Sequence, residues 1–170
     1  TYTLSNNVEN LQLTGYADID GTGNAQANVL IGNVGDNVLA GGAGNDEYRF
    51  GVGFGRDMVR ETTVGDVDTV VFEAGISASQ IQVTRSGDHL LLRQDANNIV
   101  TLENWYVADT HPVERVEFAD GTVWDVDALK SKANSAPTGT VTLTGNAAQN
   151  QTLTVNTANL ADADGLGVVL

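Results

Sequence analysis

Several residue types are scarce or absent from this sequence, and each absence excludes a class of protein. The 170-residue chain has no cysteine, so disulfides, thiolate metal sites and a cysteine nucleophile are excluded. It has 8 basic residues against 22 acidic ones, which gives a formal charge of -14. This balance argues against nucleic acid and anionic membranes as partners, because both select for basic side chains. No apolar run approaches the roughly 18 residues that a membrane-spanning helix needs.

The acidic excess instead suits a protein that binds cations. Only 18% of the residues are charged and 41% are hydrophobic, so the chain is not simply a disordered acidic tail. The two histidines, His89 and His111, fit no Ser/His/Asp or His-metal spacing. No glycine-rich run is followed by the Lys-Ser/Thr pair of a phosphate-binding loop. We therefore expect no enzymatic activity.

Glycine is abundant and follows a period of nine residues. Ten of the 19 glycines lie between Gly21 and Gly55. Three units follow one another directly, and a two-residue insertion precedes each of the two later units. All five units carry an acid or amide at the sixth place and an apolar residue at the eighth. The five units are GNAQANVLI (23–31), GNVGDNVLA (32–40), GGAGNDEYR (41–49), VGFGRDMVR (52–60) and TVGDVDTVV (63–71).

The physical properties of such a unit indicate stacked coils of chain. Glycines at the front allow tight turns with positive φ, and the last three residues form a very short strand with one inward side chain. Two units make one coil of about 18 residues, and successive coils stack as parallel strands around a thin core. Turn carbonyls and the carboxylate at the sixth place are oxygen ligands, which is the donor set that Ca²⁺ prefers. Ordinary hairpin turns are the alternative for the glycines, but they would not keep acid and apolar residues in phase.

The unit GGAGNDEYR resembles the G-G-x-G-x-D-x-U-x nonapeptide of RTX (haemolysin-type calcium-binding) proteins, in which U is a bulky apolar residue. The resemblance implies a parallel β-roll with Ca²⁺ between its turns, in a protein exported by type I secretion. Only this unit matches the pattern fully, and the two units before it resemble degenerate leading turns. The runs at 68–92, 100–107 and 113–124 resemble the β-rich module that commonly follows such repeats.

The stacking of the coils predicts which residues share a metal site. Units of the same parity share an edge, so each unit faces the next but one. This pairs Asp46 with Asp68 in the strongest predicted site, Asn37 with Asp57 in a weaker one, and Asn28 with Asp46 in the weakest. Two carboxylates in one pocket repel unless a cation lies between them, whereas the asparagines could simply hydrogen-bond from turn to turn. With the turn carbonyls included, the predicted ligands are Asp46, Asp68, Asp57, Asn37, Gly41, Gly42, Ala43, Gly44, Gly53, Gly55, Asp66 and Asn28.

Beyond the repeats the sequence reads as short strands and one helix. The predicted strands lie at 81–85, 90–93, 99–102, 116–118 and 123–124. Asp125 is an N-cap candidate for a helix over 126–132. Phe72, Trp105, Tyr106, Phe118 and Trp124 are the expected core aromatics. Two of them, at 105 and 106, have an alternative interpretation as a platform on which a sugar stacks.

The sequence predicts an all-β protein, with a short parallel β-roll of nonapeptide repeats packed against a small antiparallel β module. The roll with its leading strands occupies 1–72, a β-rich capping module ending in a short helix occupies 73–133, and a linker occupies 134–139. Residues 140–170 resemble the start of an Ig-like or cadherin-like repeat of large bacterial surface proteins.

The expected function is that of a calcium-binding structural module in a secreted, extracellular or cell-surface bacterial protein. It would fold on meeting extracellular Ca²⁺ and stabilise or position neighbouring domains of the same chain, with an adhesin-like parent favoured. The alternative is a carbohydrate-binding accessory module of an extracellular enzyme, with a polysaccharide as partner. Burial of Trp105 would favour the first function, and its exposure beside a groove would favour the second.

Overall fold

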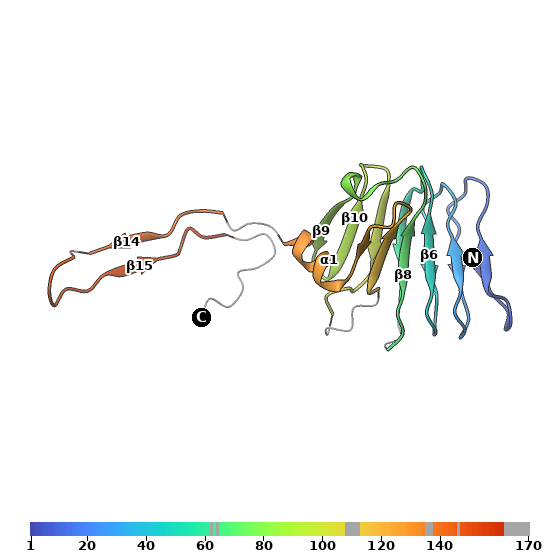
Figure 1. Ribbon diagram of the computed structural model, residues 1–170, viewed down its shortest axis with the longest axis horizontal. Helices are drawn as coiled ribbons and strands as arrows, with labels where there is room; N and C mark the ends of the chain where they lie inside the picture. The colour runs from blue at the N-terminus through green and yellow to red at the C-terminus, as the bar shows by residue number, and fades with distance from the viewer. Residues whose placement is uncertain (62, 64, 108–112, 135–137, 146, 162–170) are drawn as a thin grey trace. The chain divides into compact units, whose positions relative to one another are not determined.

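The computed structural model describes residues 1–61, 63, 65–107, 113–134, 138–145 and 147–161. The chain divides into two compact units, Thr1–Ala133 and Asn134–Leu170. Strands form most of the regular structure in both units (Figure 1). The predicted all-β fold is therefore confirmed. His111 and parts of the predicted linker and C-terminal segment lie outside the described residues.

The first unit is built from two sheets. One has seven strands in the order β1-β3-β5-β7-β11-β10-β9, and the other has six in the order β13-β12-β8-β6-β4-β2. The strands of the first sheet are β1 (Tyr2–Thr3), β3 (Gly21–Thr22), β5 (Val38–Ala40), β7 (Arg56–Val59), β9 (Gln82–Ser86), β10 (His89–Arg93) and β11 (Ile99–Leu102). The strands of the second are β2 (Asn10–Gln12), β4 (Val29–Ile31), β6 (Glu47–Phe50), β8 (Thr69–Phe72), β12 (Arg115–Phe118) and β13 (Val123–Trp124).

Successive repeat strands alternate between the two sheets, as the predicted parity of the units requires. All pairs between repeat strands are parallel. In the six-stranded sheet, Leu30 is in register with Tyr48 and Tyr48 with Val70. In the seven-stranded sheet, Leu39 is in register with Val59. These five residues are the eighth residues of the five units, and all are buried in the space between the sheets.

The core contains a row of aromatic rings, and the first two-residue insertion contributes one of them. Phe50 lies in that insertion, and its ring centroid is 5.6 Å from that of Phe54 and 6.1 Å from that of Phe72. The row continues from Phe72 to Phe118 at 5.3 Å and on to Trp124 at 4.6 Å. All five rings are buried. The aromatic row therefore connects the repeat coils with the segment that follows them.

The β-rich segment joins the coils by extending both of their sheets (Figure 1). Strand β11 pairs in parallel with β7, and β12 pairs in parallel with β8. Only then does the pairing become antiparallel, through β10 and β9 on one sheet and β13 on the other. Hairpins join β9 to β10 and β12 to β13, and Gly87 and Gly121 have positive φ in their turns. Both sheets thus continue without a break from the repeat coils into the β-rich segment that follows residue 72.

The helices are short. The 3₁₀ helix η1 (Ala78–Gln80) precedes β9, and α1 (Val126–Ala133) follows β13. The Asp125 carboxylate accepts the backbone N–H of Ala128 at 2.8 Å, so the predicted N-cap is confirmed. Leu129 and Ala133 are buried in the core. No helix within the described ranges is long and apolar enough to cross a membrane.

The second unit contains a single described hairpin. Strands β14 (Thr142–Thr144) and β15 (Thr154–Asn156) pair in antiparallel register. Their side chains are exposed, including Leu143 and Val155. Apolar residues and threonine alternate over 141–144 and 152–155, but the paired strands begin only at Thr142 and Thr154.

Candidate functional site

The glycines at the start of the third unit allow its turn to fold over the Asp46 side chain. A Cβ added at Gly41 would lie 2.1 Å from Asp46 Oδ2, which no side chain could tolerate. Gly42 has a φ of +106°, and a Cβ there would lie 2.5 Å from the carbonyl oxygen of Asn24 in the preceding coil. Both positions therefore require glycine, and the result is a carboxylate enclosed by its own turn.

The predicted partners at the sixth place lie next to one another on both edges of the coils. The backbone N–H of Asn28 donates to Asp46 Oδ1 at 2.7 Å, and the N–H of Asp46 donates to Asp68 Oδ1 at 2.8 Å. On the opposite edge, the N–H of Asn37 donates to Asp57 Oδ1 at 2.9 Å. Each of these aspartates thus reaches back to the coil before it. The structure therefore brings together the three predicted pairs.

Each of these hydrogen bonds occupies only one of the two oxygens of a carboxylate. Asp46 Oδ2, Asp57 Oδ2 and Glu61 Oε2 are buried and have no hydrogen-bond partner among the residues that the structure describes. The three residues are 1%, 2% and 9% exposed. A buried carboxylate oxygen without a partner costs several kcal/mol in stability unless a cation neutralises it. These oxygens fit Ca²⁺, which binds carboxylate and carbonyl oxygens.

Three of the buried carboxylates form one cluster. An oxygen of Asp46, one of Glu61 and one of Asp68 all lie within 4.8 Å of one another. Two of these residues were predicted, but Glu61 was not, because it lies in the two-residue insertion between the fourth and fifth units, which the nine-residue period does not cover. The signal that could have found it is its place two residues after the inward-facing Val59, which corresponds to Gly41 after Leu39.

Burial makes these acids hard to ionise. It raises the pKa of Asp46 to about 6 and that of Asp68 to about 7. It also raises the pKa of Asp57 and of Glu61 to about 8 in each case. Repulsion from neighbouring carboxylates is a further cause, as between Glu61 and Asp68. Raised pKa values of this kind mark a site that favours either protons or a metal cation.

The raised pKa values predict an unusual pH dependence of stability when metal is removed. In excess EGTA, the free energy of unfolding should fall as the pH rises from about 4 to about 8, because the folded protein retains protons that the unfolded chain has released. The slope should be about 1.4 kcal/mol per pH unit for each acid within its range. Saturating Ca²⁺ should reverse the trend, because protons and the cation compete for the same oxygens.

Urea unfolding at about pH 5 and about pH 8, with EGTA and with Ca²⁺, measures both trends. Asp57→Asn is the matched variant, since it removes one buried acid and should make the slope in EGTA shallower. Stability that rises with pH in EGTA over this range would contradict the prediction.

The remaining predicted residues of the third and fifth units lie around the cluster. Asp66 accepts the N–H of Gly44 at 2.9 Å, so this carboxylate ties the fifth turn to the third. The N–H of Ala43 donates to the carbonyl oxygen of Asn24 at 3.3 Å. With Gly41 and Gly42 described above, the whole predicted loop 41–44 therefore lies between the turns of the neighbouring coils.

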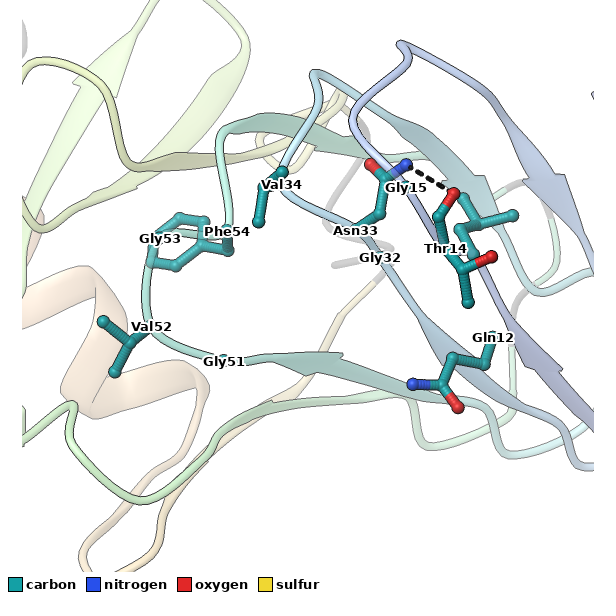
Figure 2. A pocket seen from close by; sticks show the side chains of 11 residues that line it. Gln12, Thr14, Gly15, Gly32, Asn33, Val34, Gly51, Val52, Gly53 and Phe54 are labelled. Carbon is teal, nitrogen blue, oxygen red and sulfur yellow. Dashed lines mark hydrogen bonds between the residues drawn. The ribbon is translucent and has the colours of Figure 1, made fainter.

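On the opposite edge, three turns border a groove of about 320 Å³ (Figure 2). Residues 12–15, 32–34 and 51–54 line it, and Gly53 is among them. Gly55 has a φ of +89°, and a Cβ there would lie 2.6 Å from the carbonyl oxygen of Gly35. The fourth unit's turn thus packs directly on the backbone of the second unit's turn, beside Asp57.

In the two leading units the asparagine side chains make hydrogen bonds that a carboxylate could not make. The Asn37 side chain accepts the N–H of Asn33 at 2.9 Å through Oδ1 and donates through Nδ2 to the Ile19 carbonyl at 2.8 Å. Asn28 likewise accepts the N–H of Asn24 at 2.7 Å and donates to the Val8 carbonyl at 3.4 Å. The amide groups therefore connect these turns to the preceding coil by hydrogen bonds.

Comparison with known proteins agrees with this geometry. Residues 22–56 match the family model of the RTX calcium-binding nonapeptide repeat (4 copies), and residues 94–128 match that of the haemolysin-type calcium binding protein related domain. The iron-regulated protein FrpA of Neisseria meningitidis serogroup C is 34% identical in an alignment of 98 residues, and the match covers 54% of this chain and 9% of the relative. Repeats of this type bind Ca²⁺. Residues 22–56 are therefore similar to RTX calcium-binding nonapeptide repeats, and residues 94–128 are similar to the haemolysin-type calcium binding protein related domain.

Proposed function

We propose that this chain is a structural module of a secreted bacterial protein, and that its coils become stable when they bind extracellular Ca²⁺. The observation that carries the proposal is the set of buried carboxylate oxygens without hydrogen-bond partners in the described turns, at Asp46, Asp57 and Glu61. Without a cation, the chain would bury these charges at a large cost. The formal charge of -14 adds repulsion that opposes a compact state.

The residues of the chain have distinct roles in this proposal. Asp46 and Asp68 would hold one cation between the third and fifth turns, and Asp57 would hold another beside the second and fourth turns. When bound, Ca²⁺ supplies positive charge that neutralises the carboxylates and joins adjacent coils. The glycines let the turns approach closely enough for this, and the buried eighth residues provide the thin apolar core.

We infer the cellular location and the class of the parent protein from likeness to known proteins. The match with this chain spans about 9% of the length of the FrpA relative. RTX repeats are typical of proteins exported by type I secretion, and we infer the same route and an extracellular or cell-surface location here. An adhesin-like parent is favoured because residues 140–170 resemble the start of a tandem surface repeat. The module would then stabilise neighbouring domains, without catalysis of its own.

A carbohydrate-binding role receives less support. Trp105 is 0% exposed, and its indole N–H donates to the carbonyl oxygen of Val113 at 2.7 Å. Trp124 is also buried and lies under the Lys132 ammonium at 4.3 Å. Tyr106 is partly buried and lies under the Arg85 guanidinium at 4.2 Å. The predicted stacking platform therefore functions as core packing, which favours the structural role.

Two isosteric substitutions test the proposed sites. Asp46→Asn removes a carboxylate charge from the three-carboxylate cluster and from the predicted pair of Asp46 with Asn28. Asp57→Asn removes a carboxylate charge only from the opposite edge. Calorimetric titration with Ca²⁺ should show that Asp46→Asn loses more affinity or stoichiometry, because charge count sets the affinity of calcium sites. A larger loss for Asp57→Asn would show that the ranking of the sites is wrong. Absence of Ca²⁺ binding by the unsubstituted chain would overturn the proposal itself.

A further inference from the structure

Glu61 occupies a place that is glycine in the two preceding coils of the same column. It lies two residues after Val59 of β7, as Gly41 lies two residues after Leu39 of β5 and Gly23 two residues after Gly21 of β3. The connection from β7 to β8 covers residues 60–68, whereas the connection from β5 to β6 covers 41–46. The longer connection makes room for a side chain where the shorter ones admit none.

The Glu61 side chain turns inward rather than toward solvent. Its Oε1 accepts the N–H of Gly41 at 2.9 Å, and this bond orients the carboxylate. Its Oε2 has no hydrogen-bond partner among the described residues, and Glu61 as a whole is 9% exposed. The oxygens of Asp46 and Asp68 lie within 4.8 Å in the same cluster. An acidic residue is thus buried against two others, with one oxygen directed into the space they share.

We propose that Glu61 is a third carboxylate ligand of the cation held by Asp46 and Asp68, and that it sets the affinity of this site. The inference rests on the proposed calcium-binding function and concerns one residue outside the nonapeptide motif. Three carboxylates surround this cation, whereas the site on the opposite edge has the carboxylate of Asp57 and the amide of Asn37. Affinity for Ca²⁺ rises with the number of charged ligands. The cluster therefore fills first when Ca²⁺ is added.

The alternative is that Glu61 serves only as an acceptor for the Gly41 N–H. Glu61→Gln separates the two roles, since glutamine keeps an acceptor oxygen for that N–H and has the same shape but no charge. If Glu61 is a ligand, the substitution has opposite effects in the two states. It removes repulsion from the metal-free cluster and stabilises it, while it weakens the metal-bound one.

The experiment compares the full chain with its Glu61→Gln and Glu103→Gln variants by Ca²⁺ calorimetry and by thermal unfolding in EGTA and in Ca²⁺. Glu103 is the matched control, because it pairs with Arg60, the neighbour of Glu61, at 2.5 Å and lies outside the cluster. We expect Glu61→Gln to weaken the tightest site about tenfold or more, to raise the unfolding temperature in EGTA and to reduce the gain from Ca²⁺. Glu103→Gln should leave Ca²⁺ binding unchanged.

Two results would overturn the inference. One is a tightest site with unaltered affinity in Glu61→Gln, and the other is a parallel shift of its unfolding temperatures in EGTA and in Ca²⁺. If Glu61→Gln does not fold, Glu61→Gly introduces the residue of the two preceding coils, and its tightest site must likewise weaken. If the unsubstituted chain binds no Ca²⁺, the proposed function fails; if it binds Ca²⁺ and the variants bind equally well, only the role of Glu61 fails.

Discussion

At a temperature between the unfolding temperatures of the metal-free and the Ca²⁺-bound chain, removal of Ca²⁺ with excess EGTA is expected to abolish most of the β-sheet circular dichroism of residues 20–70, and addition of Ca²⁺ should restore it. The coils bury Asp46, Asp57, Glu61 and Asp68, and their core is thin, with one row of eighth residues along each sheet and the aromatic row beside it. Ca²⁺ binds the folded turns and not the unfolded chain, so it stabilises by mass action. One site at a Ca²⁺ concentration about 100-fold above its dissociation constant contributes about 2.7 kcal/mol.

Thermal unfolding followed at the same wavelength gives the size of the effect. With two sites filled, the unfolding temperature should rise by more than about 10 °C over its value in EGTA. Mg²⁺ is the control cation, because it demands small octahedral sites and retains its waters, and it should substitute poorly. Identical spectra and unfolding temperatures with and without Ca²⁺ would refute the expectation.

Truncation after Thr69 is expected to have a comparably large effect. The fragment loses β11 and β12, which pair in parallel with β7 and β8, so both sheets end in unpaired edges. It also loses Phe72, whose ring packs against those of Phe50 and Phe54. Removal of a buried phenylalanine typically costs about 3–5 kcal/mol by itself. The 1–69 fragment should therefore aggregate or require far more Ca²⁺ to fold.

Truncation after Ala133 is the matched control. It removes the second compact unit, Asn134–Leu170, and leaves both sheets and α1 of the first unit complete. Its Ca²⁺-dependent unfolding should equal that of the full chain within about 0.5 kcal/mol. Ca²⁺ titrations followed by circular dichroism compare the two fragments. A 1–69 fragment with unchanged Ca²⁺ dependence would show that the β-rich segment does not stabilise the coils, and the carbohydrate-binding alternative would gain support.

The repeat period by itself determined much of the fold and of the candidate site. A unit of nine residues repeats the same local geometry, so its eighth residues must face inward and units of equal parity must stack. Leu30, Tyr48 and Val70 are therefore in register, and Asp46 contacts Asp68 as predicted. The hairpin at Gly87 and the helix cap at Asp125 were predictable for a different reason, because each depends on only a few adjacent residues.

Only the tertiary structure decided the features that depend on residues far apart in sequence or outside the period. Glu61 lies in an insertion, so its place in the cluster follows from the register of β7 with β5 and from the length of the next turn. The parallel pairing of β11 with β7 and of β12 with β8 joins segments that are separated by three other strands in each case, and no local pattern encodes it. The tertiary structure also decided between the two interpretations of Trp105, because it buries this side chain completely.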